Sequence, residues 1–103
     1  MDADEYQRLA MRTAADGVDW GNVGLGLAGE SGEVADAIKK AIYQGHVLDA
    51  DHLKEELGDI CWYISLGCKC LGESLSSVMQ GNIDKLKRRY PHRFSPEESI
   101  NRK

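Results

Sequence analysis

The sequence has 103 residues, a length that usually forms one domain and is too short for two. Its 42% hydrophobic and 29% charged residues, with only two prolines, are typical of a globular chain and argue against disorder. No run approaches the roughly 18–20 apolar residues of a membrane span, and the acidic start lacks the apolar core of a signal peptide. Three cysteines, an odd number, argue against a disulfide framework. We therefore expect a cytoplasmic protein without a membrane partner.

Charge is distributed unevenly along the chain, whose formal net charge is −4. Residues 1–60 contain thirteen acidic and five basic residues, whereas residues 61–103 contain four acidic and eight basic ones. Such a separation allows a protein to bring a cation and a polyanion together. A solvated basic helix end would explain the second half equally well, because helix C-termini favour positive charge. Charge alone leaves both interpretations open.

Apolar residues recur with helical spacing throughout, and no segment alternates with the two-residue period of a half-buried strand. Capping residues and glycines delimit four expected helices, at about 4–15, 22–44, 49–71 and 74–90. Pro91 stops the last one, because proline cannot continue a helix. We therefore predict an all-α fold with four main helices in a bundle. A single domain would occupy residues 1–94, and residues 95–103 would be a polar tail.

The expected third helix carries apolar residues on two faces. One stripe contains Leu57, Ile60 and Ile64, which we assign to the core. Trp62 and Leu66 lie almost opposite that stripe, where a single four-helix unit would leave both in water. We therefore expect Trp62 and Leu66 to form a contact between subunits.

Polar residues interrupt the apolar stripes of two other helices. Glu30 lies near the middle of the stripe on the second helix, and Glu33 lies at its edge. Asn82 lies near the centre of the stripe on the fourth helix, with Lys85 and Arg89 close by. Such groups are costly to bury without partners, and exceptions of this kind cluster at functional sites. These inward polar groups predict a functional site between the helices.

Four carboxylates form two pairs with i, i+3 spacing, namely Glu30 with Glu33 and Glu56 with Asp59. If they converged, they would repel one another strongly unless cations neutralised them. Carboxylate oxygens suit Mg²⁺ or Mn²⁺, which keep coordination positions for water and phosphate. A ferritin-like di-iron bundle would need a histidine three residues after glutamate, which neither pair has. Either pair alone is usually a solvated helix face, but two pairs beside apolar stripes favour a metal site.

Residues 24–36, 55–60 and 82–91 resemble the MazG-like nucleoside triphosphate pyrophosphohydrolases, and the similarity covers roughly residues 6–94. The Glu-x-x-Glu and Glu-x-x-Asp motifs in this order, followed by Arg89-Tyr90-Pro91, carry the resemblance. It implies an all-α, oligomeric enzyme that uses Mg²⁺ to cleave NTPs or dNTPs between the α and β phosphates, releasing a nucleoside monophosphate and pyrophosphate. Full-length MazG proteins have two such domains, whereas this chain has one.

The resemblance also implies roles for particular residues. The metal ligands would be Glu30, Glu33, Glu56 and Asp59. Asn82, Lys85 and Arg89 would contact the nucleotide or its phosphates. Glu33, at the edge of its stripe, is our choice for the carboxylate that orients the attacking water or accepts its proton.

Weaker candidates lie elsewhere in the sequence. Lys40 is seven residues after Glu33 on the same flank and could reach a phosphate, although a surface ion pair with Asp36 would also explain it. Trp20 could stack on a base or pack against protein. The histidines at positions 46, 52 and 92 fall in or near expected loops. Asp49 and His52 have a spacing that metal ligands also use, but a solvated helix start explains them better.

Three hypotheses for the function follow from these patterns. The first is a Mg²⁺-dependent pyrophosphohydrolase that acts on the nucleotide pool as a homo-oligomer, a dimer or tetramer, without a nucleic-acid partner. The second is a regulatory module that binds nucleotide or metal without turnover. The third is a helical interaction module whose charges are only a solvated surface. The inward positions of Glu30 and Asn82 count against the third hypothesis.

Overall fold

The computed structural model describes residues 1–93 and 96–101, and every regular element within them is an α-helix. The helices are α1 (Ala3–Met11), α2 (Trp20–Tyr43), α3 (Ala50–Leu71), α4 (Leu75–Arg89) and α5 (Pro96–Asn101). The predicted all-α class with four main helices is confirmed. The short α5 lies where the sequence predicts only a polar tail. Among the described residues, none of the helices has the length and apolar character that crossing a membrane requires.

Short polar side chains determine where the main helices begin. A side-chain oxygen at the N-cap accepts a hydrogen bond from a backbone N–H in the following first turn; the capping residues are Asp2, Asp19, Asp49 and Ser74. At the other end, α3 stops at Gly72, whose φ of 73° is the left-handed conformation that glycine adopts without a Cβ penalty. Local capping chemistry therefore explains why the expected boundaries lie close to the observed ones.

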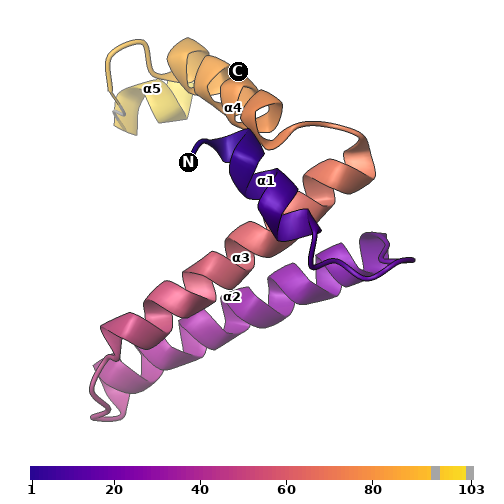
Figure 1. Cartoon of the computed structure of the whole chain (residues 1–103). Coiled ribbons are helices and arrows are strands. Elements are labelled where there is room, and N and C mark those ends of the chain that lie inside the picture. The colour runs from indigo at the N-terminus through magenta and orange to yellow at the C-terminus, as the bar shows by residue number, and fades with distance from the viewer. Residues whose placement is uncertain (94–95, 102–103) are drawn as a thin grey trace.

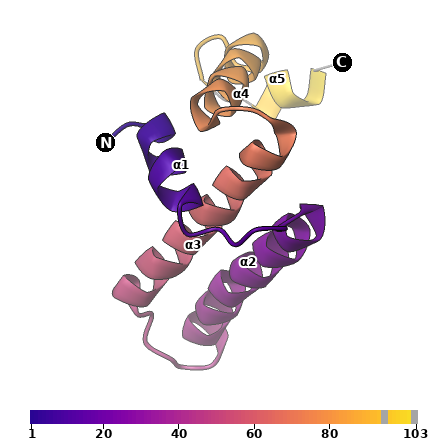
Figure 2. The same cartoon turned by 45° about the vertical axis from the view of Figure 1, so that its right-hand side comes forward.

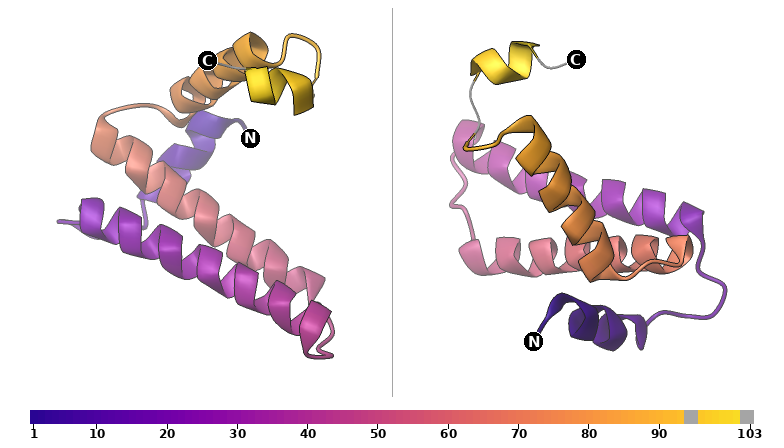
Figure 3. Two further views of the ribbon diagram at one scale, coloured as in Figure 1. Left: turned by 180° about the vertical axis from the view of Figure 1, so that it is seen from behind. Right: turned by 90° about the horizontal axis from the view of Figure 1, so that it is seen from above.

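The two longest helices form the centre of the molecule. α2 and α3 are antiparallel and lie side by side as a hairpin (Figures 1 and 3). α1 packs across α3, and α4 contacts α1 and the end of α3 (Figures 1 and 2). The four helices thus form an open arrangement in which the hairpin extends beyond the part that α1 covers.

Two measures of size show how open this arrangement is. The Cα radius of gyration is 16.8 Å, against roughly 13 Å for a compact domain of this length. The accessible surface is 7731 Å², which is roughly 1,900 Å² more than a compact chain of the same mass exposes. Large parts of the helix surfaces therefore remain uncovered within one chain.

A small core lies along the C-terminal half of α3. Leu66 is 0% exposed there. Beside it, the Nε1–H of Trp62 donates to Thr13 Oγ1 at 2.8 Å and to the carbonyl oxygen of Ala10 at 3.2 Å. The prediction that Trp62 and Leu66 form a subunit contact is therefore wrong. A helical wheel of α3 alone does not show that α1 and α2 cover two different faces of it.

The face of α3 that the sequence assigns to the core is, in contrast, largely exposed. Leu57 is 54% exposed and Ile64 is 40% exposed, while Ile60 is half-buried. We call Leu57, Ile64 and Leu71 the α3 stripe, and the exposed apolar residues of α4 the α4 stripe, namely Val78, Met79, Ile83 and Leu86. Assigning Leu57 and Ile64 to the core is wrong for the single chain, because α1 and α2 both pack elsewhere on α3.

Polar side chains of α1 hold the beginning of α4. The two carboxylate oxygens of Asp4 accept hydrogen bonds from the backbone N–H and the hydroxyl of Ser76, at 2.9 and 2.7 Å. These bonds lower the pKa of Asp4. The Gln7 amide accepts from the N–H of Leu75 at 2.8 Å and donates to the carbonyl of Glu73 at 3.2 Å. Since the first N–H groups of a helix lack intrahelical partners, α1 acts as a cap for α4.

Candidate active site

Three carboxylates meet between the two helices of the hairpin. Glu30 and Glu33 lie one turn apart on α2, and Glu56 faces them from α3. One carboxylate oxygen from each lies within 4.8 Å of the other two. The i, i+3 spacing places both α2 residues on one face, and the antiparallel packing brings α3 against that face. The structure thus brings together three of the four residues predicted as metal ligands, and we call them the carboxylate cluster.

The members of the carboxylate cluster differ in exposure. Glu56 is only 8% exposed, Glu30 is half-buried and Glu33 is exposed. The Oε2 atoms of Glu30 and Glu56 are buried and have no hydrogen-bond partner among the described residues. Sharing a proton with Glu30, and secondly with Glu33, raises the pKa of Glu56 to about 8, and burial contributes to the same shift. The cluster therefore crowds three carboxyl groups so closely that Glu56 retains its proton at neutral pH when no cation is bound.

A divalent cation fits this set of donors. Mg²⁺ and Mn²⁺ prefer oxygen ligands and retain open positions for water and phosphate. Glu30 and Glu56 each offer a buried oxygen without a hydrogen bond, and Glu33 offers its oxygens on the exposed side. Unpartnered buried oxygens are costly in the absence of a cation, because their desolvation is not compensated. We therefore expect the cluster to bind such an ion.

Asp59, the fourth predicted ligand, lies beside the cluster rather than within it. It is exposed and lines a cavity of about 320 Å³ together with Glu30, Trp62 and Tyr63. The rings of Trp62 and Tyr63 contact edge to face, with centroids 5.0 Å apart. Tyr63 packs directly on α2 at Gly26, where an added Cβ would overlap the ring. We call this space the aromatic cavity.

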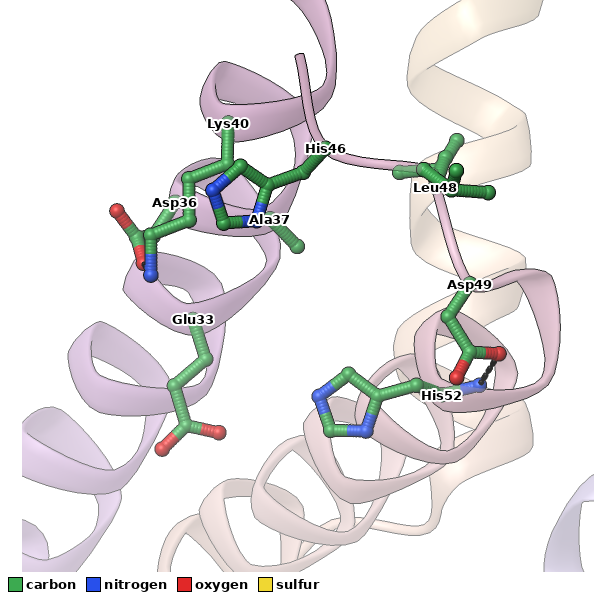
Figure 4. A pocket seen from close by; sticks show the side chains of 9 residues that line it. Glu33, Asp36, Ala37, Lys40, His46, Leu48, Asp49 and His52 are labelled. Atoms are coloured by element: carbon green, nitrogen blue, oxygen red, sulfur yellow. Dashed lines mark hydrogen bonds and ion pairs between the residues drawn. The ribbon is translucent and has the colours of Figure 1, made fainter. Parts of the chain in front are cut away.

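A second cavity, of about 310 Å³, lies at the closed end of the hairpin between the last turns of α2 and the first turns of α3. Its polar walls are formed by Glu33, Asp36, Lys40, His46, Asp49 and His52. Figure 4 shows Glu33 and His52 facing each other across this space, with Lys40 and His46 close together farther along. The Nε2 of His52 also lies 3.6 Å from Oε1 of Glu56. We call this space the turn cavity.

Sequence comparison agrees with this geometry. Residues 22–94 match the profile of the MazG nucleotide pyrophosphohydrolase domain, a range that contains the carboxylate cluster and both cavities. The chain belongs to this family. It is also 38% identical to the Gene 37 protein of Mycobacterium phage L5 over 71 residues, which are 65% of this chain and 62% of the phage protein. The match thus spans less than two thirds of that relative. No solved structure matches the chain.

In this MazG domain, several predicted substrate-binding residues lie away from the cluster. Asn82, Lys85 and Arg89 are exposed on α4, which packs on α1 and the end of α3 (Figure 2). Trp20 is 54% exposed and precedes Glu30 by ten residues, or about 15 Å of helix rise. Within one chain, only Lys40 of these candidates lines a cavity beside the carboxylates.

Both cavities of the MazG domain depend on contacts between α2 and α3 that the helical patterns do not predict. His46 and His52 are exposed, as the sequence predicts for His52, and the turn between α2 and α3 places both on the wall of the turn cavity. The N-cap bond from the N–H of His52 to Asp49 could have indicated this, because it fixes where α3 begins. Gly26, one turn before Glu30, was a second unused signal, since a glycine inside a helix often admits a close neighbour.

Proposed function

We propose that this MazG domain is an enzyme that hydrolyses a nucleoside or deoxynucleoside triphosphate between its α and β phosphates. The products would be the monophosphate and pyrophosphate, and the biological role would be control of the nucleotide pool. The observation that carries this proposal is the carboxylate cluster, with two buried oxygens that lack partners, in a chain of this family. Phosphoryl transfer needs neutralised phosphate oxygens, a positioned water and a stabilised leaving group rather than a nucleophilic side chain.

The exposure of each carboxylate in the cluster determines the role that we assign to it. Bound Mg²⁺, or Mn²⁺ as a substitute, supplies charge neutralisation and a water of lowered pKa. Glu30 and Glu56 would hold the cation from the buried side, and Asp59, which lines the aromatic cavity together with Glu30, would complete the ligand set. Glu33 is the most exposed member of the cluster, so it can orient the attacking water and accept its proton.

A second copy of this chain would complete the site. The cationic residues of α4 lie away from the cluster of their own chain, and the α3 and α4 stripes are uncovered. If a second copy covered the excess surface on each chain, the interface would bury roughly 3,800 Å² in total, in the range of obligate homodimers. Asn82, Lys85 and Arg89 of one chain would then contact the phosphates bound by the other, where they would stabilise developing negative charge. We therefore propose a homo-oligomer, a dimer or tetramer.

A nucleotide panel tests the proposed reaction. Purified protein with Mg²⁺ and each common NTP or dNTP should release monophosphate and pyrophosphate in equal amounts, resolved by anion-exchange chromatography. Orthophosphate as the first product would contradict cleavage between the α and β phosphates. Saturable binding of a Mg²⁺–nucleotide without turnover would instead support the alternative, a non-catalytic regulatory module. Binding of neither Mg²⁺ nor nucleotide would leave only a helical interaction module.

A further inference from the structure

The two cavities lie on opposite sides of the carboxylate cluster along the hairpin. Residues 30, 59, 62 and 63 line the aromatic cavity, whereas the turn cavity begins at Glu33 and extends toward the connection between α2 and α3. The aromatic cavity has carboxylates and rings on its walls but no cationic side chain or histidine among the described residues. The turn cavity has one lysine and two histidines. The two cavities therefore offer different chemical groups to a nucleotide bound at the cluster, nitrogen donors on one side and aromatic rings on the other.

An ion pair holds the Lys40 side chain beside the turn cavity, and a backbone hydrogen bond holds the main chain of His46 there. Lys40 Nζ lies 2.9 Å from Asp36 Oδ2, one turn earlier on the same helix. The N–H of His46 donates to the carbonyl oxygen of Lys40 at 3.1 Å, and Gly45 permits this tight turn with a φ of 71°. The backbones of Lys40 and His46 therefore lie together at the end of α2, and both side chains line the turn cavity (Figure 4).

The net charge of these walls restricts what the turn cavity can bind. Glu33, Asp36 and Asp49 face the space against Lys40 as the single permanent cation. A free polyanion would be repelled by this balance, whereas the same anion carrying a divalent cation would be neutralised enough to enter. Lys40 and His46 could then donate charge-assisted hydrogen bonds to its phosphate oxygens.

We propose that the turn cavity binds the pyrophosphate half of the substrate, and the pyrophosphate product, as a magnesium complex held by Lys40 and His46. This assignment rests on the proposed pyrophosphohydrolase function. The nucleoside half then extends the other way, toward the aromatic cavity, where Tyr63 and Trp62 offer ring surfaces. The cluster, between the two cavities, lies where the bond between the α and β phosphates would be broken.

Titration calorimetry of the full chain with inorganic pyrophosphate in excess Mg²⁺ tests this assignment without turnover. We expect Lys40→Met to weaken binding of magnesium pyrophosphate about tenfold, because one charge-assisted hydrogen bond is lost. Lys39→Met is the matched control, since Lys39 also pairs with Asp36, at 3.4 Å, but does not line the cavity. It should bind magnesium pyrophosphate like the wild type. Pyrophosphate in EDTA should bind to neither variant.

Product inhibition separates this inference from the proposed function. Lys40→Met should raise the inhibition constant of pyrophosphate and leave that of the nucleoside monophosphate unchanged. His46→Ala, at an exposed turn position, should act in the same direction and provides a second variant that does not disturb a helix. Equal pyrophosphate binding by Lys40→Met and Lys39→Met, or weaker monophosphate inhibition instead, would overturn the assignment while the enzyme still released pyrophosphate. Release of orthophosphate by the wild type would overturn the proposed function itself.

Discussion

Glu56 on α3 faces Glu30 on α2, and their carboxyls are close enough that Glu56 keeps its proton to about pH 8. The unfolded chain releases this proton near the ordinary pKa of 4.5. Between these two values the folded protein binds more protons than the unfolded chain, so the free energy of unfolding falls as pH rises. Above the folded-state pKa of Glu56, its whole contribution to the free energy of unfolding has been lost.

The first prediction isolates this contribution of Glu56. In EDTA, the Tm of the wild type should fall relative to that of Glu56→Gln as pH rises from about 5 to about 8, because the neutral amide has no proton to lose. Differential scanning calorimetry across that range gives the comparison. Groups away from the carboxylate cluster titrate alike in both proteins and cancel. If the two Tm curves stay parallel, the proximity of Glu30 and Glu56 does not control this titration.

The second prediction concerns metal binding and turnover. Glu30→Gln, Glu56→Gln and Asp59→Asn should each lower kcat/KM on the order of 10²-fold while the helical content by circular dichroism persists. The charge loss weakens the hold on the cation, and Mg²⁺ should no longer raise the Tm of Glu56→Gln as it does that of the wild type. Glu55→Gln is the matched control, because Glu55 is exposed and outside the cluster. Near wild-type turnover of all three variants at saturating Mg²⁺ would refute the ligand assignment.

How far the sequence predicts this structure depends on whether a feature is local. Capping residues such as Asp49 and Ser74 act within one turn, so the helices could be placed from sequence. Glu30 and Glu56 could be recognised because each lies beside an apolar stripe on its own helix. The contact between Trp62 and α1 could not be predicted in this way, because the part of α1 that binds Trp62 lies about fifty positions earlier in the sequence. The same limit applies to His46, which gains its position from the turn between two helices.

The third prediction concerns the contact between α1 and α4. Gln7→Ala removes the hydrogen bonds to Leu75 and Glu73 and leaves the N–H of Leu75 without its side-chain acceptor. We expect a loss of about 1–2 kcal/mol in the free energy of unfolding. For a domain of this size, each kcal/mol lowers the Tm by roughly 4–8 °C. Urea unfolding followed by circular dichroism measures the change, and Gln80→Ala on the exposed face of α4 is the control.

The last prediction distinguishes the core of the single chain from the proposed interface. Leu57→Glu combined with Ile64→Glu should place two charges in the surface that a second copy covers. Sedimentation should then shift to the monomer mass, and activity should fall although neither side chain is proposed to bind metal or nucleotide. Helical content should persist, because both side chains are partly exposed within one chain.

Leu66→Ala provides the contrast, because Leu66 is 0% exposed within one chain. It should cost about 2–5 kcal/mol of stability without changing the mass of the folded species. The two variants therefore test an assignment opposite to that of the helical wheel of α3, with Leu66 in the core and with Leu57 and Ile64 in the proposed interface. A Leu57→Glu, Ile64→Glu protein that keeps the wild-type mass in solution would show that the α3 stripe lies outside any interface. The excess surface of the chain would then need a different cover, over the α4 stripe or over the exposed apolar residues of α2 such as Leu25 and Ile42.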